Sequence, residues 1–191
     1  MSLMRRDSDG VRRIEGEGVF LRAPELRDYQ EWAELREASR DFLTPWEPTW
    51  APDETSRGSF RYKIRRYAED ARDDRAYAFF LFRESDHALV GGITLSNVRR
   101  GVSQSASLGY WAGETMAGKG YTTAGVKALV RYAFDDLALH RVEAACQPEN
   151  AASRRVLAKA GFEEEGRARA YLKIAGAWRD HILFASVSDA G

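Results

Sequence analysis

The segment Met116-Ala117-Gly118-Lys119-Gly120-Tyr121-Thr122 decides how the middle of this chain folds. It follows an apolar, β-prone run that ends at Leu108-Gly109-Tyr110-Trp111, and it precedes a run with helical periodicity. Glycines at alternate positions let the backbone turn tightly, and they leave no Cβ to hold a ligand away. The amides at the helix start would then face outward beside the positive end of the helix dipole, where a phosphate binds well. The segment therefore predicts a strand–turn–helix unit that holds a phosphorylated cofactor with its main chain.

Composition places the chain among ordinary globular proteins. Its 191 residues are enough for one domain with a sizeable core. The 29 basic residues balance 29 acidic ones, so no net field favours nucleic acid or a membrane as partner. The apolar runs are too short to span a bilayer, and no signal-peptide core follows the N-terminal arginines. One cysteine, Cys146, excludes an internal disulfide and a cysteine-based zinc cluster. We expect a cytoplasmic protein with no metal and with no direct nucleic-acid or membrane partner.

The first part of the chain is predicted to hold a loose arm, one strand and two helices. Residues 1–17 are polar, charged and contain glycine, which is typical of a flexible arm. Val19–Arg22 predicts a short strand, and apolar residues at helical spacing predict a helix over 26–39. The two prolines and two tryptophans that lie between Phe42 and Pro52 favour a structured loop. Asp53 is then expected to cap a second helix that ends near residue 71.

The second part alternates strands and helices. Asn150 is predicted to cap the last helix and Gly161 to end it. The order implies a twisted mixed sheet of about seven strands flanked by about four helices, an α/β (α+β mixed) fold, in a single domain over 18–188. Two strands lead into helix starts at one cleft, an arrangement that suits an extended phosphate-bearing cofactor. The predicted strands are Tyr77–Phe82, Leu89–Leu95, Ser103–Trp111, Arg141–Gln147, Glu165–Ile174 and Trp178–Val187, and the helices are 122–137 and 151–160.

Short motifs along most of the chain carry a resemblance to a known family. Besides the glycine segment and Leu108-Gly109-Tyr110-Trp111, they are Phe42-Leu43-Thr44-Pro45-Trp46-Glu47-Pro48, Ser96-Asn97-Val98-Arg99-Arg100-Gly101, Leu139-His140-Arg141-Val142-Glu143-Ala144, Pro148-Glu149-Asn150 with Ala152-Ser153, Ala160-Gly161-Phe162-Glu163-Glu164-Glu165-Gly166 and Trp178-Arg179-Asp180-His181. Together they resemble the GCN5-related N-acetyltransferase (GNAT) superfamily. The Trp46 and Trp178 motifs are similar to its RimJ/RimL-like branch of ribosomal-protein N-acetyltransferases. The resemblance implies a GNAT-type acyl-CoA N-acyltransferase fold, with acetyl-CoA (coenzyme A) as cofactor.

The resemblance also assigns residues to acetyl-CoA. Superfamily members part the strand equivalent to 103–111 from the one equivalent to 141–147, and acetyl-CoA lies in the gap. The exposed backbone would pair with pantetheine amides, one amide would polarise the acetyl carbonyl, and the glycine segment would hold the pyrophosphate. The broad signature has Arg or Gln where this chain has Thr115, which leaves the site mainly to main-chain amides. The implied cofactor-binding residues are Leu108, Gly109, Tyr110, Trp111, Met116, Ala117, Gly118, Lys119, Gly120, Tyr121, Thr122, Asn150 and Ser153.

The chemistry asks for a neutral amine and for a proton on the departing thiolate. A chain-terminal α-amine has a pKa of roughly 7.7–8.0 and needs only a modest base, whereas a lysine near 10.4 needs a stronger one. Glu47 is the first candidate for that carboxylate and Glu114 the second, against the alternative that both are solubilising charges. Ser153, in the first turn after Asn150, is the candidate proton donor, against the alternative that it only caps its backbone. Tyr110 is a reserve acid, and the predicted catalytic set is Ser153, Asn150 and Glu47.

Aromatic residues in the 42–52 loop are candidates for the acceptor pocket. Phe42, Trp46 and Trp50 could wall that pocket together with Glu47, or they could fix the loop onto the first helices. Cys146 alternates with apolar residues on one strand face, which favours a core role over a nucleophile. The histidines have no metal-ligand spacing to a second histidine or cysteine.

These observations support one leading function and two alternatives. The leading hypothesis is an acetyl-CoA-dependent N-acetyltransferase that acts on the N-terminal α-amine of a protein, a ribosomal protein with a small first residue being one candidate. The first alternative keeps the donor and changes the acceptor to a small amine, such as a polyamine, an amino acid or an antibiotic. The second is a non-catalytic acyl-CoA-binding module. A monomer and a homodimer are both compatible with the sequence.

Overall fold

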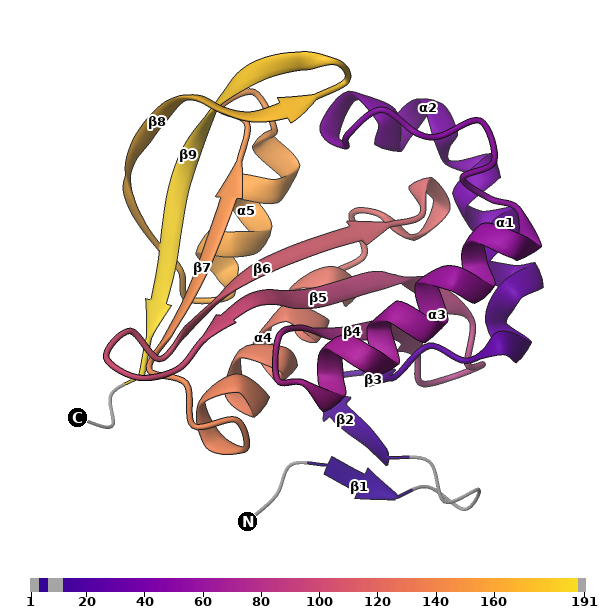
Figure 1. Ribbon diagram of the computed structural model, residues 1–191, viewed down its shortest axis with the longest axis horizontal. Helices are drawn as coiled ribbons and strands as arrows, with labels where there is room; N and C mark the ends of the chain where they lie inside the picture. Colours follow the sequence, from indigo (N-terminus) through magenta and orange to yellow (C-terminus); the bar gives the residue numbers. More distant parts are fainter. Residues whose placement is uncertain (1–3, 7–11, 189–191) are drawn as a thin grey trace.

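The computed structural model describes residues 4–6 and 12–188, and within these ranges one nine-stranded sheet carries helices on both faces (Figure 1). The strands are β1 (Met4–Arg6), β2 (Arg12–Gly16), β3 (Val19–Arg22), β4 (Tyr77–Arg83), β5 (Leu89–Arg99), β6 (Ser105–Ala112), β7 (Arg141–Cys146), β8 (Glu163–Ile174) and β9 (Ala177–Val187). The helices are α1 (Tyr29–Ala38), α2 (Arg40–Leu43), α3 (Arg57–Arg72), α4 (Tyr121–Asp135) and α5 (Ala151–Lys159), with the 3-10 turns η1 (Leu26–Asp28), η2 (Thr44–Trp46) and η3 (Glu114–Met116).

Two hydrophobic cores hold the helices on the sheet. On one face, α4 buries Val126 and Leu129 against strand residues such as Leu81, and Gly125 lets the helix approach so closely that a Cβ there would lie 2.7 Å from that leucine. On the other face, Trp32 of α1 and Phe60 of α3 pack together, with ring centroids 4.7 Å apart. Each such buried side chain contributes about 1.5–3 kcal/mol of hydrophobic stabilisation. The sheet therefore separates an α4 side from an α1–α3 side.

The strands β6 and β7 run parallel and part halfway along their length. They pair from Ser105 to Leu108 and from Arg141 to Ala144, and this pairing is the parallel one in the sheet order β1-β2-β3-β4-β5-β6-β7-β9-β8. Beyond that point, residues 109–112 pair with β5 alone and residues 145–146 pair with β9 alone among the described residues. The divergence is visible in Figure 1, where β7 turns away from β6 toward the β8–β9 hairpin. It leaves one edge of the β6 backbone open in the middle of the sheet.

The fold class and the main strand order agree with the prediction, and the differences lie in the first part of the chain. The prediction of a loose arm over residues 1–17 is wrong in part. Residues 12–16 form β2, which pairs with β3 and buries Ile14 against Leu21. Residues 1–3 and 7–11 of that arm lie outside the described residues. β1 and β2 bring the strands to nine rather than about seven, and α2, inside the expected loop, brings the α-helices to five. The α3 helix begins after Ser56 rather than at Asp53, since the Ser56 side chain accepts the Ser59 N–H at 3.1 Å.

Candidate active site

The glycine segment forms an open turn at the start of α4. Gly118 and Gly120 have φ values of +74° and +87°, in the left-handed region that favours glycine, and a Cβ at either position would meet no atom within 4 Å. Within the described chain, no backbone N–H from Gly118 to Thr123 donates to a protein acceptor, and the first to do so is that of Ala124. Six consecutive amides at the positive end of a fifteen-residue helix thus face outward. A run of free amides at a helix start is the kind of site to which a phosphate binds.

Across the gap between β6 and β7, two hydroxyl groups meet. The Tyr110 Oη atom lies 2.7 Å from Ser153 Oγ, so a β6 side chain reaches the first turn of α5. Asn150 caps that helix, as predicted, because its Oδ1 accepts the Ser153 N–H at 2.9 Å. The Ser153 hydroxyl is therefore not the cap of its own helix and instead pairs with Tyr110. Burial raises the pKa of Tyr110, so its hydroxyl keeps its proton at neutral pH.

Cys146 lies at the end of β7 beside the same hydroxyl pair. Its side chain is 5% exposed, and burial raises the pKa of the thiol, with Ser153 opposing that change. A thiol kept protonated in apolar surroundings is a poor nucleophile. The predicted core role of Cys146 agrees with its place in the main hydrophobic cluster.

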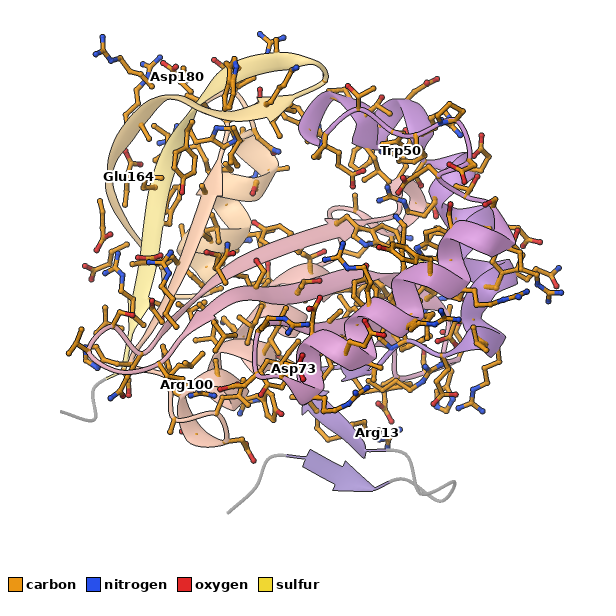
Figure 2. All side chains as sticks on the ribbon, in the orientation of Figure 1. Arg13, Trp50, Asp73, Arg100, Glu164 and Asp180 are labelled. Atoms are coloured by element: carbon orange, nitrogen blue, oxygen red, sulfur yellow. The ribbon has the colours of Figure 1, made fainter. Side chains whose placement is uncertain are left out.

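On the opposite face, the predicted carboxylate Glu47 is held by Arg36. The two guanidinium nitrogens Nη1 and Nη2 donate to its two oxygens at 2.8 Å each, and the Trp50 indole N–H donates at 2.7 Å. The Arg36 guanidinium stacks on Trp50 and Trp111, 4.2 and 4.9 Å from the ring centroids. Figure 2 shows Trp50 on the helical side of the molecule, across from the labelled Glu164 and Asp180 on the β8–β9 hairpin. Arg36, Glu47, Trp50 and Trp111 form what we call the arginine clamp.

Sequence patterns did not single out Arg36 or indicate the position of the Trp111 ring. Arg36 follows Trp32 by one helical turn, so it lies on the apolar face of α1, and a charge in that position was the available signal. The Trp111 ring lies on β5 because Gly92 has no side chain, and a Cβ there would come within 2.6 Å of the indole nitrogen. The Gly91-Gly92 pair inside a predicted strand was the signal for such a close approach.

The loop that carries Glu47 is fixed at three places. The clamp holds it to α1, the Ala175 N–H donates to the Glu47 carbonyl at 2.9 Å, and the Gln147 side chain donates to the Pro45 carbonyl at 3.1 Å. These bonds tie the loop to the β8–β9 turn and to the end of β7. Trp46 and Phe42 remain 38% and 36% exposed, so these two aromatic side chains are accessible from solvent. Glu114, the second candidate carboxylate, is exposed at the start of η3, and its N–H is bound by Ser39.

A groove opens on the side of the sheet away from α4, at the point where β6 and β7 part. Its volume is about 370 Å³, and both Gly109 of β6 and Ala145 of β7 line it. Tyr171 and Leu172, from the part of β8 that bulges off β9, line its outer wall. Arg141 on its floor is paired with Glu143 and Glu165. The groove therefore lies along β6 and β7 and reaches the point where the two strands part.

The described part of the chain contains no cluster of three or more potential metal-ligating side chains. None of its helices combines the length and the hydrophobicity needed to cross a bilayer.

Comparison with known proteins agrees with this geometry. The chain matches the family model of the acetyltransferase (GNAT) domain over residues 19–163. It is 38% identical over 172 residues to the probable N-acetyltransferase YjcK of Bacillus subtilis (strain 168), covering 90% of this chain and 95% of that protein. It is 33% identical over 173 residues to the ribosomal protein uS5-alanine N-acetyltransferase of Escherichia coli (strain K12), covering 91% and 89%.

The fold comparison leads to the same family. The structure titled Mycobacterium smegmatis RimJ in complex with CoA-disulfide has a TM-score of 0.85 to this one at 37% identity, covering 90% of this chain and 82% of that one. The open amides of the glycine segment and the exposed edge of β6 fit acetyl-CoA, the cofactor of such enzymes. The chain belongs to the GNAT family of acetyltransferases, in its RimJ/RimL-like branch.

Proposed function

We propose that this enzyme transfers the acetyl group of acetyl-CoA to the N-terminal α-amine of a protein, with a ribosomal protein that begins with a small residue as the first candidate. The observation that carries the proposal is the parting of β6 and β7, with a hydroxyl pair on one side of the gap and a groove of about 370 Å³ on the other. A chain terminus can enter such a groove end-on and bring its amine to the gap. The similarity to a uS5-alanine N-acetyltransferase supports this acceptor class.

Acetyl-CoA would be held mainly by the main chain. The free amides from Gly118 to Thr123 would bind the pyrophosphate, with Lys119 nearby, and the open edge of β6 from Leu108 to Trp111 would pair with the pantetheine amides. Bound acetyl-CoA supplies the thioester whose acyl carbon the amine attacks. A β6 amide beside that carbonyl would stabilise the oxyanion.

The acceptor amine needs little help from a base. About a quarter or less of an α-amine with a pKa of roughly 7.7–8.0 is neutral near pH 7, so water in the groove can take the remaining proton. Glu47 is a weak candidate for that base, because Arg36 and Trp50 already occupy its oxygens. We assign it instead to positioning, as the group that holds the Trp46 loop beside the groove.

The departing thiolate would take its proton from the hydroxyl pair. Tyr110 keeps its proton because burial raises its pKa, and Ser153 accepts or donates the 2.7 Å hydrogen bond that links them. Asn150 holds Ser153 in place through the cap of α5. The pair can therefore deliver one proton and be replenished from the solvent side.

Intact-mass analysis with three classes of acceptor tests the proposal. Purified enzyme and acetyl-CoA are incubated with peptides that begin with Ala or Ser, with the same peptides blocked at the N-terminus but carrying a lysine, and with a panel of polyamines and amino acids. We expect an increase of one acetyl group on the free N-termini alone. Acetylation of the small amines without the peptides would replace the proposed acceptor, and acetyl-CoA binding without any product would indicate the non-catalytic alternative.

A further inference from the structure

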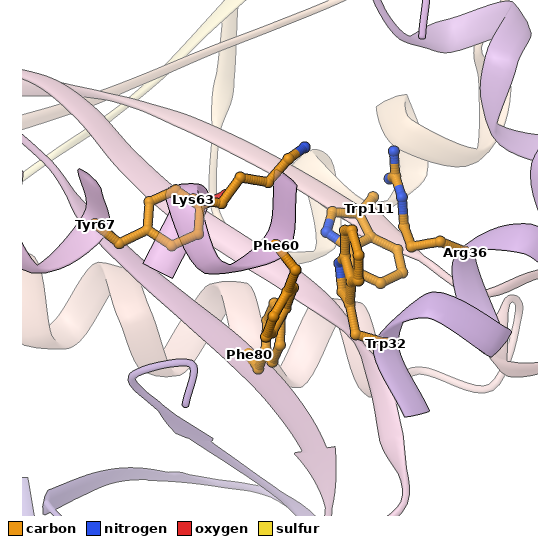
Figure 3. A pocket seen from close by; sticks show the side chains of 7 residues that line it. All are labelled: Trp32, Arg36, Phe60, Lys63, Tyr67, Phe80 and Trp111. Carbon is orange, nitrogen blue, oxygen red and sulfur yellow. The ribbon is translucent and has the colours of Figure 1, made fainter. Parts of the chain in front are cut away.

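The groove over the parted strands differs from the cavity that α1 and α3 enclose with the sheet. That cavity, shown in Figure 3, has a volume of about 200 Å³ and walls of aromatic rings such as Trp32 and Trp111. The cations that line it, Arg36 and Lys63, are each paired with a glutamate. The groove floor instead has neutral polar side chains of β5 and β6, which are Ser96, Asn97 and Ser107. The floor therefore offers neutral hydrogen-bonding groups to a ligand.

A bulge in β5 lies beside this part of the floor. Ser96 pairs with Ser107. The next pair joins Arg99 to Ser105, so β5 advances by three residues where β6 advances by two. Asn97 follows Ser96 directly and has a φ of +52°, a left-handed conformation that asparagine tolerates better than most L-residues. Bulges of this kind re-aim a side chain and are frequent next to active sites.

The bulge turns the Asn97 side chain toward the groove. Successive side chains of a regular strand point to opposite faces, so the residue after Ser96 would point toward α4. Asn97 instead has its Nδ2 atom 3.5 Å from Ser107 Oγ, on the face of β6 opposite to the buried Leu108. A hydrogen bond of that length is weak, and Asn97 Oδ1 accepts none within the described residues. The exposed amide can therefore offer a donor and an acceptor to a ligand.

A peptide group is the natural complement of this amide. Its C=O accepts a hydrogen bond and its N–H donates one, so one asparagine side chain can bind one peptide group through either bond or both. The charged groups of the same groove are paired with one another, since Arg141 donates to Glu143 and Glu165. Asn97 is thus suited to main-chain recognition of an acceptor rather than to recognition of a charged side chain.

The distance from the gap indicates which peptide group lies over Asn97. Gly109 is the first β6 residue beyond the pairing with β7. Ser107 precedes it by two residues, a span of about 7 Å, and Asn97 lies one strand further across the floor, about 5 Å away. An extended acceptor advances by about 3.3–3.6 Å per residue. With its amine at the gap and its chain along the groove, the peptide group between its second and third residues comes over Asn97.

We propose that Asn97 hydrogen-bonds the peptide group that joins the second and third residues of the acceptor. The inference rests on the proposed function, because it names the feature by which the same groove recognises a peptide chain. Free amino acids and polyamines lack this group, so Asn97 distinguishes a protein N-terminus from them.

Ester-substituted peptides test the proposal by turnover. They begin with Ala and carry an ester in place of the peptide bond between residues two and three, which removes the N–H and weakens the carbonyl as an acceptor. Matched peptides carry the ester between residues four and five. We expect the first ester to raise KM of the wild-type enzyme about three- to tenfold with kcat unchanged, the size expected for one neutral hydrogen bond. The second ester should have almost no effect.

Asn97→Gly removes the amide and keeps the backbone, because glycine adopts a φ of +52° without strain. This variant should raise KM for the unmodified peptide by the same factor and should no longer distinguish the ester, the non-additive result of a double-mutant cycle. Its KM for acetyl-CoA should not change. Gln104→Gly is the matched control, because Gln104 is also an exposed amide side chain with a positive φ, +39°, but lies on the β5–β6 turn. It should keep the full preference for the unmodified peptide.

Calorimetry of peptide binding gives a second readout that needs no turnover. If the unmodified peptide binds more tightly than the ester in an Asn97-dependent way but is not acetylated, the Asn97 assignment stands and the proposed function fails. Acetylation with equal KM for the two peptides would overturn the Asn97 assignment alone. An equal loss for both peptides in Asn97→Gly would also overturn it, by limiting Asn97 to shaping the bulge. Peptides that neither bind nor react would overturn both proposals.

Discussion

Tyr110 and Trp111 are neighbours on one strand and point to opposite faces of the sheet, where their surroundings differ in kind. On the Tyr110 face, the groups near the gap are left open: a run of unpaired amides and a pair of neutral hydroxyls. On the Trp111 face, the charges are matched to one another, with Arg36 bound to Glu47 and stacked between two indoles. The first face is built to donate hydrogen bonds to a ligand common to the whole family. The second is a preassembled wall, and variation there can change the acceptor without disturbing the donor site.

The largest expected effect comes from removing both hydroxyls on the Tyr110 face. The double variant Tyr110→Phe with Ser153→Ala leaves no proton donor across the gap, so kcat should fall on the order of 10²- to 10³-fold, the range of general acid catalysis. KM for acetyl-CoA should stay near the wild-type value, because main-chain amides bind it. Each single variant should lose less, since the remaining hydroxyl can still donate. Thiol release from acetyl-CoA measures all four rates.

Tyr77→Phe is a suitable control for that experiment. It also removes a tyrosine hydroxyl, but this hydroxyl donates to Asp74, just before the start of β4. Its kcat should match that of the wild type. A double variant that keeps most of the wild-type turnover would remove the hydroxyl pair from the mechanism.

A change on the Trp111 face should lower the free energy of unfolding and weaken acceptor binding. Arg36→Met removes the two hydrogen bonds to Glu47 and leaves that carboxylate, 20% exposed, without its cation. Breaking such a pair costs about 3 kcal/mol of unfolding free energy, which urea denaturation would measure. KM for the acceptor should rise as the Trp46 loop loosens, while KM for acetyl-CoA stays constant.

A double variant separates charge from packing in the clamp. Arg36→Met combined with Glu47→Gln leaves no uncompensated charge, so it should recover part of the lost stability. A double variant that is no more stable than Arg36→Met alone would mean that the stacking on Trp50 and Trp111, rather than the ion pair, holds the loop.

The sequence predicted the Tyr110 face better than the Trp111 face, and the reason is the range of the signals. Gly120 and Gly161 have the positive φ values that their positions beside helices predicted, and Asn150 is the cap of α5. Turn and cap signals lie within a few residues of what they specify. The hydrogen bond between Tyr110 and Ser153 spans 43 residues of sequence and follows only from the arrangement of strands.

The arginine clamp depends on long-range packing. Sequence patterns therefore pointed to Glu47 and Trp50 but not to Arg36, which binds both. Glu47 was singled out as a free carboxylate, yet its role depends on Arg36, eleven residues earlier on a helix face that looks suited to apolar residues. β2 was missed for a similar reason. Its sequence Arg-Arg-Ile-Glu-Gly has one apolar residue, and the strand forms because Ile14 is buried between β3 and α4.

The glycine segment gives a smaller effect that isolates backbone geometry. Gly120→Ala adds only a methyl group in open space, but its φ of +87° costs an L-residue about 1–2 kcal/mol. If the turn relaxes to avoid that cost, the amides shift, and the Kd for acetyl-CoA should rise about tenfold by calorimetry. Gly101→Ala is the matched control, because Gly101 has a φ of +68° and also meets no atom within 4 Å, but lies on the β5–β6 turn. An equal loss of affinity in both variants would point to global destabilisation.

The smallest expected change concerns the alkaline limb of the pH profile, and it bears directly on the difference between the two faces. As pH rises, kcat/KM should increase with the neutral fraction of the α-amine, around pH 7.7–8.0, and then stay level to about pH 9.5. Burial raises the pKa of Tyr110, so its hydroxyl remains protonated across this whole range and no donor is lost. A tyrosine at its ordinary pKa of about 10 would begin to lose that proton near pH 9. A decline above pH 9 that is present in the wild type and absent in Tyr110→Phe would therefore show that Tyr110 is exposed to solvent during catalysis. The Tyr110 face would then be more open to solvent than its burial in the structure indicates.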